Sequence, residues 1–236
     1  MNKVKELAAM IDHSILHPTF TDNDLIEGCK LAAEYGVASV CVKPYMVKKA
    51  VELLKGSSVA VGCVIGFPHG NSSIKIKRYE ARDACKEGAK EIDMVINIGK
   101  AIQGDIKYIH SEIKEIAIEC HKRGAILKVI LETDFITDDK TKIELCQLCS
   151  RLKVDYVKTS TGYGFVKKEN GDYNYTGATI KDLQLMADNV SGDVKIKAAG
   201  GIRTLDQLLE VQKAGATRCG ATATKEILTE AISRFE

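Results

Sequence analysis

The sequence predicts an α/β protein of the (β/α)8 TIM-barrel class, and three observations favour this architecture. Short runs rich in β-branched residues alternate with longer amphipathic segments along the chain, with eight of each. The chain has 236 residues, of which 45% are hydrophobic, enough to bury the core of one large domain. A doubly wound open sheet would favour a GxGxxG pattern after the first run, and this chain has none there. We therefore expect a single domain over residues 1–236.

The predicted elements follow from the spacing of apolar residues and from capping signals. The expected strands span residues 12–16, 39–43, 59–65, 91–97, 126–132, 155–160, 194–199 and 217–221. The expected helices span residues 22–35, 44–54, 72–87, 105–123, 137–151, 178–189, 204–214 and 223–234. Thr204 is an N-cap candidate, and helices are expected to stop at Gly36, Gly88, Gly124 and Gly215. The opening segment "MNKVKELAAM" predicts a further amphipathic helix.

The composition argues against several classes of partner. There are 34 Lys and Arg residues against 32 Asp and Glu, a net charge of +2, and no basic block marks a nucleic-acid footprint. The longest apolar runs are far shorter than the roughly 20 residues of a membrane span. The N-terminal segment lacks the apolar stretch and cleavage site of a signal peptide. We expect a cytoplasmic protein without nucleic-acid or membrane partners, and a homodimer is the assembly we consider.

The eight cysteines lie in apolar strand and helix contexts, so we expect them to be reduced. Cys146 and Cys149 form a CxxC pattern, but the surrounding residues have helical periodicity and no second ligand pair accompanies them. Core packing is therefore the favoured interpretation, and we predict no metal site.

Charged side chains interrupt the predicted strands. They are Asp93 in "EIDMVIN", Lys128 and Glu132 in "LKVILE", Lys158 in "DYVKTS" and Lys197 in "KIKAAGG". A barrel has no sheet edge and helices cover its outer face, so these side chains must be paired or point into the barrel mouth. A structural ion pair explains any one of them equally well. Together they indicate a site at the carboxyl ends of the strands.

Two of these residues indicate amine chemistry. Lys158 and Lys197 lie on consecutive predicted strands, so side chains with the same facing are neighbours. Two ammonium groups in a partly dry cavity repel each other, and the repulsion adds to desolvation in lowering the pKa of one of them. A neutral lysine amine attacks carbonyls and forms a Schiff base, an electron sink that needs no metal or cofactor. Asp93 is expected to pair with the lysine that stays charged and to help relay protons.

Two glycine-bearing loops indicate a phosphate site. The segment "AAGGIRT" places Gly200 and Gly201 before one predicted helix, and "RCGATAT" places Gly220 and Thr222 before the last one. In (β/α)8 barrels, the loops after the seventh and eighth strands commonly bind phosphate through backbone N–H groups and a helix N-terminus. Arg203 adds a positive charge there. The alternative is that the glycines only form tight turns.

The motifs resemble those of the deoxyribose-phosphate aldolases, a family of class I aldolases. The matching segments extend over nearly the whole chain, and their combination is highly specific: "IDHSILHP", "SVCVKP", "VIGFPHG", "EIDMVIN", "LKVILET", "VKTSTG", "GAT", "KAAGGIRT" and "RCGAT". The resemblance implies an aldehyde-lyase that reversibly cleaves a phosphosugar, 2-deoxy-D-ribose 5-phosphate, to D-glyceraldehyde 3-phosphate and acetaldehyde. It also implies a lysine Schiff base and no metal or other cofactor.

The resemblance further implies roles for individual residues. Lys158 in "VKTSTG" resembles the Schiff-base lysine, Lys197 in "KAAGG" the second, pKa-lowering lysine, and Asp93 the proton-relay aspartate. The implied substrate-binding residues are Asp12, Ser14, Cys41, Lys128 and Thr161. The implied phosphate-binding residues are Gly162, Gly200, Gly201, Arg203, Gly220 and Thr222.

The segment after "VKTSTG" departs from the family pattern. Where a short connection is usual, "YGFVKKENGDYNYT" separates Gly162 from Gly177. Its "NG" predicts a hairpin or flap over residues 165–175. If this flap closes over the site, Lys167 and Lys168 are expected near the phosphate end and the tyrosines of the segment near the enamine. The alternative is a solvent-exposed loop without a role, because surface loops tolerate insertions at little cost.

The C-terminal segment is the second departure. Many family members end in a tail with a tyrosine near the site, whereas this chain ends in "AISRFE". Tyr163, Tyr173 and Tyr175 are candidates to replace that tyrosine.

Three other interpretations stay open at this point. His13, His17 and His69 with Asp12 could belong to a metal-dependent hydrolase, although His13 and His17 lie four positions apart across a strand end and should face apart. A non-catalytic phosphosugar-binding barrel would keep the glycine loops but has no need for two adjacent lysines. A transaldolase-like or keto-acid aldolase barrel would keep the Schiff base and act on another substrate.

Overall fold

The computed structural model describes residues 2–167 and 169–236, and in them eight parallel strands close into a barrel. The strands are β1 (Ile11–Ile15), β2 (Ser39–Val42), β3 (Ala60–Ile65), β4 (Glu91–Val95), β5 (Ile126–Ile130), β6 (Tyr156–Lys158), β9 (Lys195–Ala199) and β10 (Arg218–Ala221). They pair in the order β1-β10-β9-β6-β5-β4-β3-β2, so β10 closes on β1. The predicted (β/α)8 barrel is confirmed.

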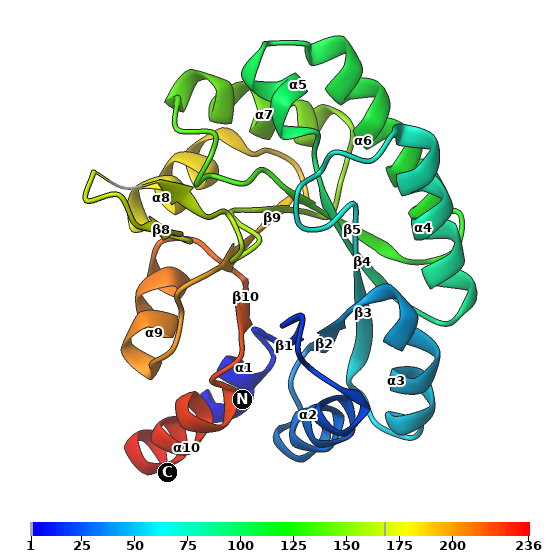
Figure 1. Ribbon diagram of the computed structural model, residues 1–236. Helices are drawn as coiled ribbons and strands as arrows, with labels where there is room; N and C mark the ends of the chain where they lie inside the picture. The colour runs from blue at the N-terminus through cyan, green and yellow to red at the C-terminus, as the bar shows by residue number, and fades with distance from the viewer. Residues whose placement is uncertain (1, 168) are drawn as a thin grey trace.

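Helices follow the barrel strands and surround them (Figure 1). They are α2 (Asp22–Tyr35), α3 (Val47–Leu53), α4 (Ile74–Lys86), α6 (Ile106–His121), α7 (Asp139–Arg151), α8 (Ile180–Asn189), α9 (Leu205–Lys213) and α10 (Thr224–Phe235). The predicted N-terminal helix is present as α1 (Lys3–Ala8). A short helix between β4 and α6, α5 (Ile98–Ile102), is not predicted by the sequence.

Several predicted elements have shifted ends. The segment predicted as one helix over residues 44–54 begins with a 3-10 turn, η1 (Pro44–Met46), before α3 starts. The strands predicted to reach residues 97, 132 and 160 end at residues 95, 130 and 158. The polar tails of these runs leave the sheet because they have other roles. Asn97 caps α5 with its side chain, and Glu132 has a positive φ of 60° that no strand tolerates.

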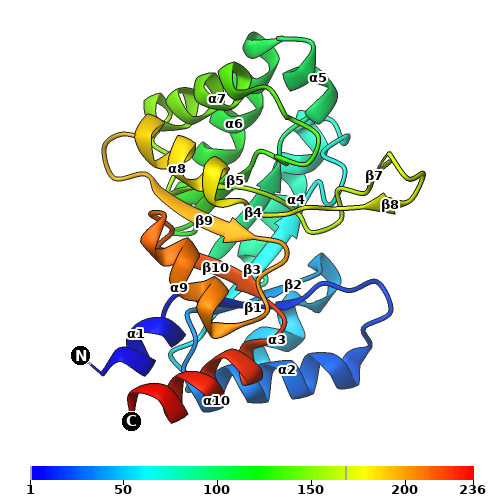
Figure 2. The ribbon, with the colours of Figure 1, turned by 90° about the vertical axis from the view of Figure 1, so that its left-hand side faces the viewer.

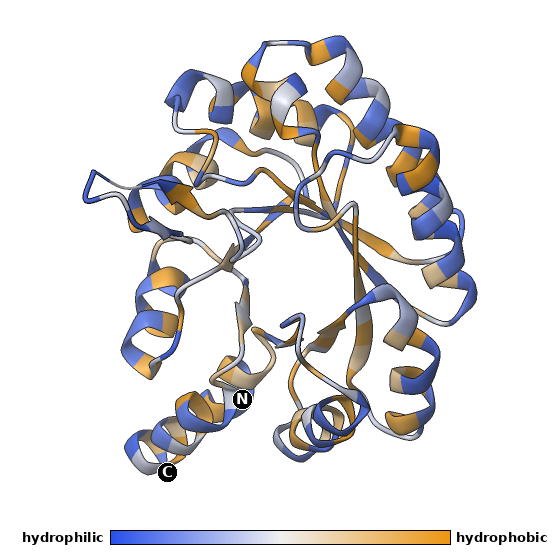
Figure 3. Ribbon diagram, viewed as in Figure 1, coloured by the Kyte–Doolittle hydropathy of each residue, from blue (hydrophilic) through white to orange (hydrophobic). Residues whose placement is uncertain are grey.

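The apolar core lies between the barrel and its helices. On β4, Ile92 and Met94 are fully buried members of this core. The alternating residues of the same strand, Glu91 and Asp93, face the barrel axis, because successive side chains of a strand point to opposite faces. Figure 3 shows apolar residues along the strands and on helix faces turned toward them, with polar residues outside. This alternation puts charges inside the barrel.

The inserted segment forms the predicted hairpin. Strands β7 (Val166–Lys167) and β8 (Tyr173–Asn174) pair antiparallel between β6 and α8. Figure 2 shows the hairpin extending past the barrel on the side toward which β9 runs, which is the side of the strands' carboxyl ends. Lys167 is exposed. The expectation for Lys168 falls outside the described residues.

Two expectations from the composition can be compared with the structure. Of the helices in residues 2–167 and 169–236, none combines the length and the apolar character that crossing a bilayer requires. All eight cysteines are free, and Cys146 and Cys149 are buried in the apolar core on α7. Core packing is therefore the correct interpretation of the CxxC pattern.

Candidate active site

A cavity of about 130 Å³ opens among the carboxyl ends of the strands. Loops after β6, β9 and β10 form one side of it, and β1 and β2 contribute the other. Of the residues that the sequence assigned to a site, twelve line this cavity: Asp12, Ser14, Cys41, Lys158, Thr161, Gly162, Lys197, Gly200, Gly201, Arg203, Gly220 and Thr222. The remaining two, Asp93 and Lys128, lie behind its wall.

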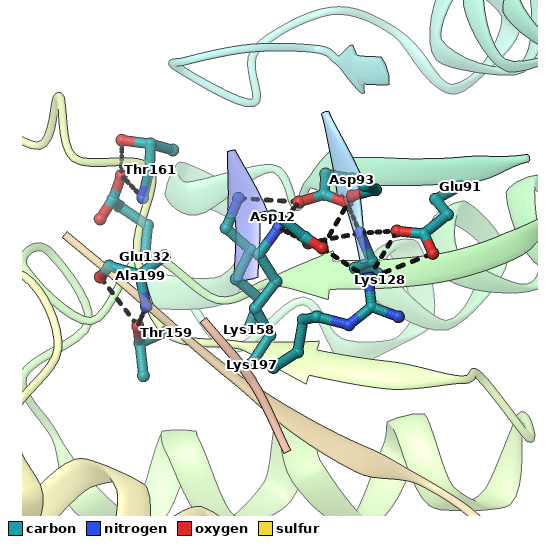
Figure 4. Close-up of polar contacts among 12 residues, drawn as sticks. Asp12, Glu91, Asp93, Lys128, Glu132, Lys158, Thr159, Thr161, Lys197 and Ala199 are labelled. Atoms are coloured by element: carbon teal, nitrogen blue, oxygen red, sulfur yellow. Dashed lines mark hydrogen bonds and ion pairs between the residues drawn. The ribbon is translucent and has the colours of Figure 1, made fainter. Parts of the chain in front are cut away.

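Lys158 combines burial with access to the cavity. The residue is 3% exposed, and its Nζ lies 2.9 Å from Oδ2 of Asp93. Lys158 and Lys197 are register partners on β6 and β9, so their side chains lie side by side (Figure 4). Burial lowers the pKa of Lys158, the Asp93 carboxylate opposes this effect, and the charge of Lys197 adds to it. The net direction is downward, which favours the neutral amine.

Lys197 differs from Lys158 in its number of carboxylate partners. Its Nζ lies 2.5 Å from Oδ2 of Asp12 and 2.7 Å from Oδ2 of Asp93. Burial works against its charge, but the carboxylates of Asp12 and Asp93 outweigh this effect and raise the pKa of Lys197. Lys197 is therefore the lysine that stays charged, and Asp93 bridges the two amines.

Asp93 contacts all three lysines of this arrangement. It is fully buried, and Lys128 approaches its second oxygen, Oδ1, at 2.9 Å. Burial favours its neutral form, but Lys128, Lys158 and Lys197 together hold the pKa of Asp93 well below its ordinary value. Asp93 is therefore a carboxylate that can accept protons only through the amines around it or through water.

At the end of the cavity for which the sequence predicts phosphate binding, glycine backbone forms much of the wall. Gly162, Gly200 and Gly201 have φ values of 83°, 89° and 84°, a region that favours glycine. A Cβ at Gly200 would lie 2.9 Å from Cα of Gly177, so the loops after β6 and β9 also approach each other too closely for side chains. Arg203 follows directly, and its Nη2 lies 3.4 Å from Oη of Tyr175. Close backbone and one guanidinium suit an anionic group.

The comparisons with known proteins agree with this geometry. Residues 7–229 match the model of the DeoC/LacD family of aldolases. The chain belongs to this family. Deoxyribose-phosphate aldolase from Rhodopirellula baltica is 45% identical over 226 residues, covering 96% of this chain and 89% of that protein. The enzyme of the same name from Thermococcus kodakarensis is 43% identical over 230 residues, covering 97% of both.

Solved structures give the same family and fold. The tetrameric deoxyribose phosphate aldolase from Aeropyrum pernix superposes with a TM-score of 0.86 at 28% identity, covering 98% of this chain and 93% of that one. The aldolase QR15 superposes with a TM-score of 0.87 at 31% identity and covers 97% of each chain. The protein is therefore an aldolase, a lyase with a TIM-barrel fold, as the sequence motifs imply.

One assignment of the sequence analysis needs correction in this DeoC/LacD aldolase. Lys128 was expected to contact substrate, but it is fully buried and does not line the cavity. Its Nζ pairs with Asp12 at 2.9 Å, Glu91 at 2.6 Å and Asp93 at 2.9 Å. Although burial opposes its charge, these carboxylates raise the pKa of Lys128. It is an internal counter-ion with no free donor for a ligand.

Other residues of the aldolase site were not assigned to it from the sequence. Arg218 donates to Asp12 and Glu91, and Ser39 donates to Oδ1 of Asp12 at 2.7 Å. Glu132, which the sequence singled out as a charge in a strand but gave no role, accepts from the backbone N–H and the hydroxyl of Thr161, which lines the cavity. Arg218 and Glu91 carried the same signal as Lys158, a charge within a predicted strand. Both fall within the strands predicted over residues 91–97 and 217–221, but the sequence analysis did not single them out.

The tyrosines proposed to replace a tail tyrosine separate in the structure. Tyr163 and Tyr175 line the cavity, whereas Tyr173 is 66% exposed and does not. Tyr163 packs edge-on against Phe67 with the ring centroids 5.6 Å apart. Of the three candidates, only Tyr163 and Tyr175 are placed to reach a bound sugar.

The histidines behind the metal-hydrolase interpretation have other contacts. His13 is buried, with Nδ1 2.8 Å from Oγ1 of Thr224, and burial lowers its pKa to about 4. Nδ1 of His17 lies 2.7 Å from Oγ1 of Thr19. Across residues 2–167 and 169–236, no group of three or more His, Cys, Asp or Glu side chains is arranged to hold a metal ion.

Proposed function

We propose that this aldolase reversibly cleaves 2-deoxy-D-ribose 5-phosphate to D-glyceraldehyde 3-phosphate and acetaldehyde through a Schiff base on Lys158. The observation that carries the proposal is the position of Lys158. It is a buried amine with a lowered pKa that reaches the cavity wall beside a charged lysine. The names of relatives that match almost the whole chain support the choice of substrate.

The chemistry begins with the amine. Nζ of Lys158 attacks C1 of the open-chain aldehyde, and loss of one water leaves an iminium. When O3 loses its proton, the C2–C3 bond breaks and its electrons move into the iminium, which becomes an enamine. D-Glyceraldehyde 3-phosphate leaves, C2 takes up a proton, and one water hydrolyses the resulting iminium to acetaldehyde and free lysine. Water and protons balance, and nothing is oxidised or reduced.

Lys197 and Asp93 are assigned to the proton transfers. Lys197 lines the cavity and is charged, so it can donate a proton and take it back. Asp93 contacts both lysines but lies behind the cavity wall, so it acts through Lys197 or through a water. Arg203 and the loops at Gly162, Gly200 and Gly201 are assigned to the phosphate.

Reductive trapping tests the proposal. Incubation with acetaldehyde and borohydride, followed by mass mapping, should place an ethyl group on Lys158. Lys158→Ala should abolish both the adduct and turnover. Lys195→Ala, which changes an exposed lysine on the same strand as Lys197, is the matched control and should retain both.

Three outcomes would contradict different parts of the proposal. An adduct on Lys197, or none on any lysine, would overturn the assignment of the nucleophile. An adduct on Lys158 together with preferential cleavage of a phosphorylated ketose or a keto acid would keep the Schiff base and overturn the substrate. Binding of deoxyribose 5-phosphate without any cleavage would favour a phosphosugar-binding barrel.

A further inference from the structure

Beneath the cavity, the barrel axis holds a cluster of seven ionisable side chains. Three are acids and four are bases: Asp12, Glu91, Asp93, Lys128, Lys158, Lys197 and Arg218. They form one connected set of ion pairs, which Figure 4 shows extending from Lys158 back to Glu91. We call this set the axial cluster. Its members are all largely buried, so water screens their charges weakly.

Two members of the axial cluster lie farthest from the cavity along their strands. Glu91 and Arg218 do not line it, and both are the first residues of their strands. Arg218 contacts both carboxylates of its end of the cluster, Asp12 and Glu91, the latter at 3.0 Å. Glu91 also pairs with Lys128 at 2.6 Å. Neither of them pairs with Lys158 directly: Glu91 is linked to it through Lys128 and Asp93, and Arg218, the register partner of Lys197, is linked to it through Asp12 and Lys197.

The charges of the axial cluster are unequal when every group is ionised. Three carboxylates then face four cations. One lost proton balances the cluster, and the number of partners decides which base loses it. Lys128 contacts three carboxylates, and Lys197 and Arg218 contact two each. Lys158 contacts Asp93 alone and shares it with the other two lysines.

We propose that Glu91 and Arg218 are positioning residues that set the charge of the axial cluster and thereby leave Lys158 as a neutral amine. Arg218 supplies the fourth cation, without which three lysines would balance three carboxylates and Lys158 would keep its proton. Glu91 has the opposite effect on Lys158, because its negative charge limits the excess of positive charge in the axial cluster. The inference rests on the proposed function in taking Lys158 as the nucleophile.

Other ionisable groups also face Lys158. Asp93 and Lys197 flank it, Cys41 lies across the cavity with a pKa raised by burial to about 11, and Glu132 lies beyond β5. Burial raises the pKa of Glu132 to about 7. None of these groups is changed in the experiment below, so their contributions are common to all variants.

The experiment measures how readily Lys158 is modified as the pH changes. Formaldehyde with cyanoborohydride methylates free amines, and mass spectrometry of the Lys158 peptide gives the pH midpoint of modification without any need for aldol turnover. Arg218→Met should raise this midpoint by about one pH unit, as loss of a nearby buried cation does. Glu91→Gln should lower it by about the same amount. The double variant should return to the wild-type midpoint, and Arg218→Lys should retain it.

The opposite shifts of the modification midpoint expected for Arg218→Met and Glu91→Gln separate this role from a purely structural one. A packing defect would reduce modification or stability in every variant and would add in the double variant instead of cancelling. If the wild-type protein is modified at Lys158 but the midpoints of Glu91→Gln and Arg218→Met do not move apart, the inference is wrong. Should Arg218→Met fail to fold, the nearly isosteric Glu91→Gln still decides, since an unmoved midpoint overturns the inference. Absence of an acetaldehyde adduct on wild-type Lys158 would instead overturn the proposed function.

Discussion

Lys158 differs from other buried lysines of this protein in how its amine is satisfied. Lys77 is fully buried as well, but Glu112 and two backbone carbonyls accept from its Nζ at 2.6–2.7 Å. Among the described residues, the one hydrogen-bond partner of Lys158 is Asp93. Burial lowers the pKa of both lysines, but of the two only Lys158 lines the cavity. Incomplete pairing, rather than burial, therefore distinguishes the proposed nucleophile.

Lys197→Leu is predicted to raise the pKa of Lys158. The substitution removes the cation beside Lys158. Asp93 then pairs only with Lys158 and Lys128, so the charged form of the Lys158 amine becomes more favourable. Because the neutral amine is the reactive form, the pH optimum of cleavage should move upward. A pH profile of kcat/KM measures this shift. A profile that only scales down, with its optimum unmoved, would assign Lys197 a different role.

Glu132 is predicted to make stability depend on pH. Burial raises its pKa from the ordinary value of 4.5 to about 7. Between these values the unfolded chain has lost the proton that the folded chain keeps, so the contribution of Glu132 is full below pH 4.5 and is lost as the pH rises through 7. The 2.5-unit difference corresponds to about 3 kcal/mol.

The test compares Glu132→Gln with the wild type. The difference in their free energies of unfolding, measured with urea at pH 4.5 and 7.5, should move by about 2–3 kcal/mol in favour of the variant at the higher pH. Glu144→Gln changes an exposed residue of α7 and serves as the control. A difference that stays constant across this range would show that Glu132 keeps the same protonation in both states.

At the scale of elements, contacts at the base of the hairpin formed by β7 and β8 hold it beside the cavity. The rings of Phe165 and Tyr175 pack edge to face with centroids 5.9 Å apart. Asp134 accepts hydrogen bonds from the backbone N–H groups of Thr176 and Gly177. These contacts hold Tyr175 in the cavity wall next to Arg203, while Tyr173 lies in the exposed part. The base of the hairpin therefore lies at the end of the cavity that we propose binds phosphate.

Tyr175→Phe is predicted to weaken binding of the phosphate group. The hydroxyl lies beside Arg203 and can donate to a phosphate bound there, so its loss should raise KM for deoxyribose 5-phosphate about tenfold. KM for unphosphorylated deoxyribose should not change, and Tyr173→Phe should behave as wild type. Replacing residues 165–175 by a short glycine linker should act in the same direction, with trapping at Lys158 retained. Equal losses for both sugars would remove the case for a phosphate contact.

The elements also show what sequence patterns can and cannot predict. The alternation of apolar runs and amphipathic segments predicted all eight barrel strands and the helices between them, because burial of apolar faces determines both. Helix α5 was missed because its five residues, "IGKAI", are too few for a periodic pattern. The turn at Glu132 was missed because its positive φ is stabilised by tertiary contacts to Thr161, which local sequence does not reveal.

In the whole molecule, the carboxyl ends of the strands meet at one end of the barrel, as the fold requires. Most residues of the candidate site could be predicted for this reason. What the sequence did not reveal is depth along the axis. In the register of β5 and β6, Lys158 pairs with Ile130, whereas Lys128 lies two residues earlier on β5. Lys128 is therefore one layer deeper than Lys158 and outside the cavity. Which residues face the barrel axis can be predicted from the local alternation along a strand. The depth of each residue along the axis depends on how neighbouring strands are staggered, which the local sequence does not reveal.

The assembly and the cellular location expected from the sequence stay predictions. Light scattering tests the homodimer, and fractionation tests the cytoplasmic location. The relative from Aeropyrum pernix, which shares the fold, is described as tetrameric. A tetramer in solution would contradict the expected homodimer.

Removal of metal ions is predicted to leave the activity of the whole enzyme unchanged. Cleavage of the C2–C3 bond needs a positive group to accept electrons, and in the proposed reaction the iminium on Lys158 supplies it, with the ammonium of Lys197 2.7 Å from the shared Asp93. Dialysis against EDTA should therefore change neither kcat nor KM for deoxyribose 5-phosphate, and added zinc should not stimulate the reaction. Strong inhibition by EDTA that zinc reverses would show that a metal ion polarises the substrate, and Lys158→Ala would then retain measurable turnover.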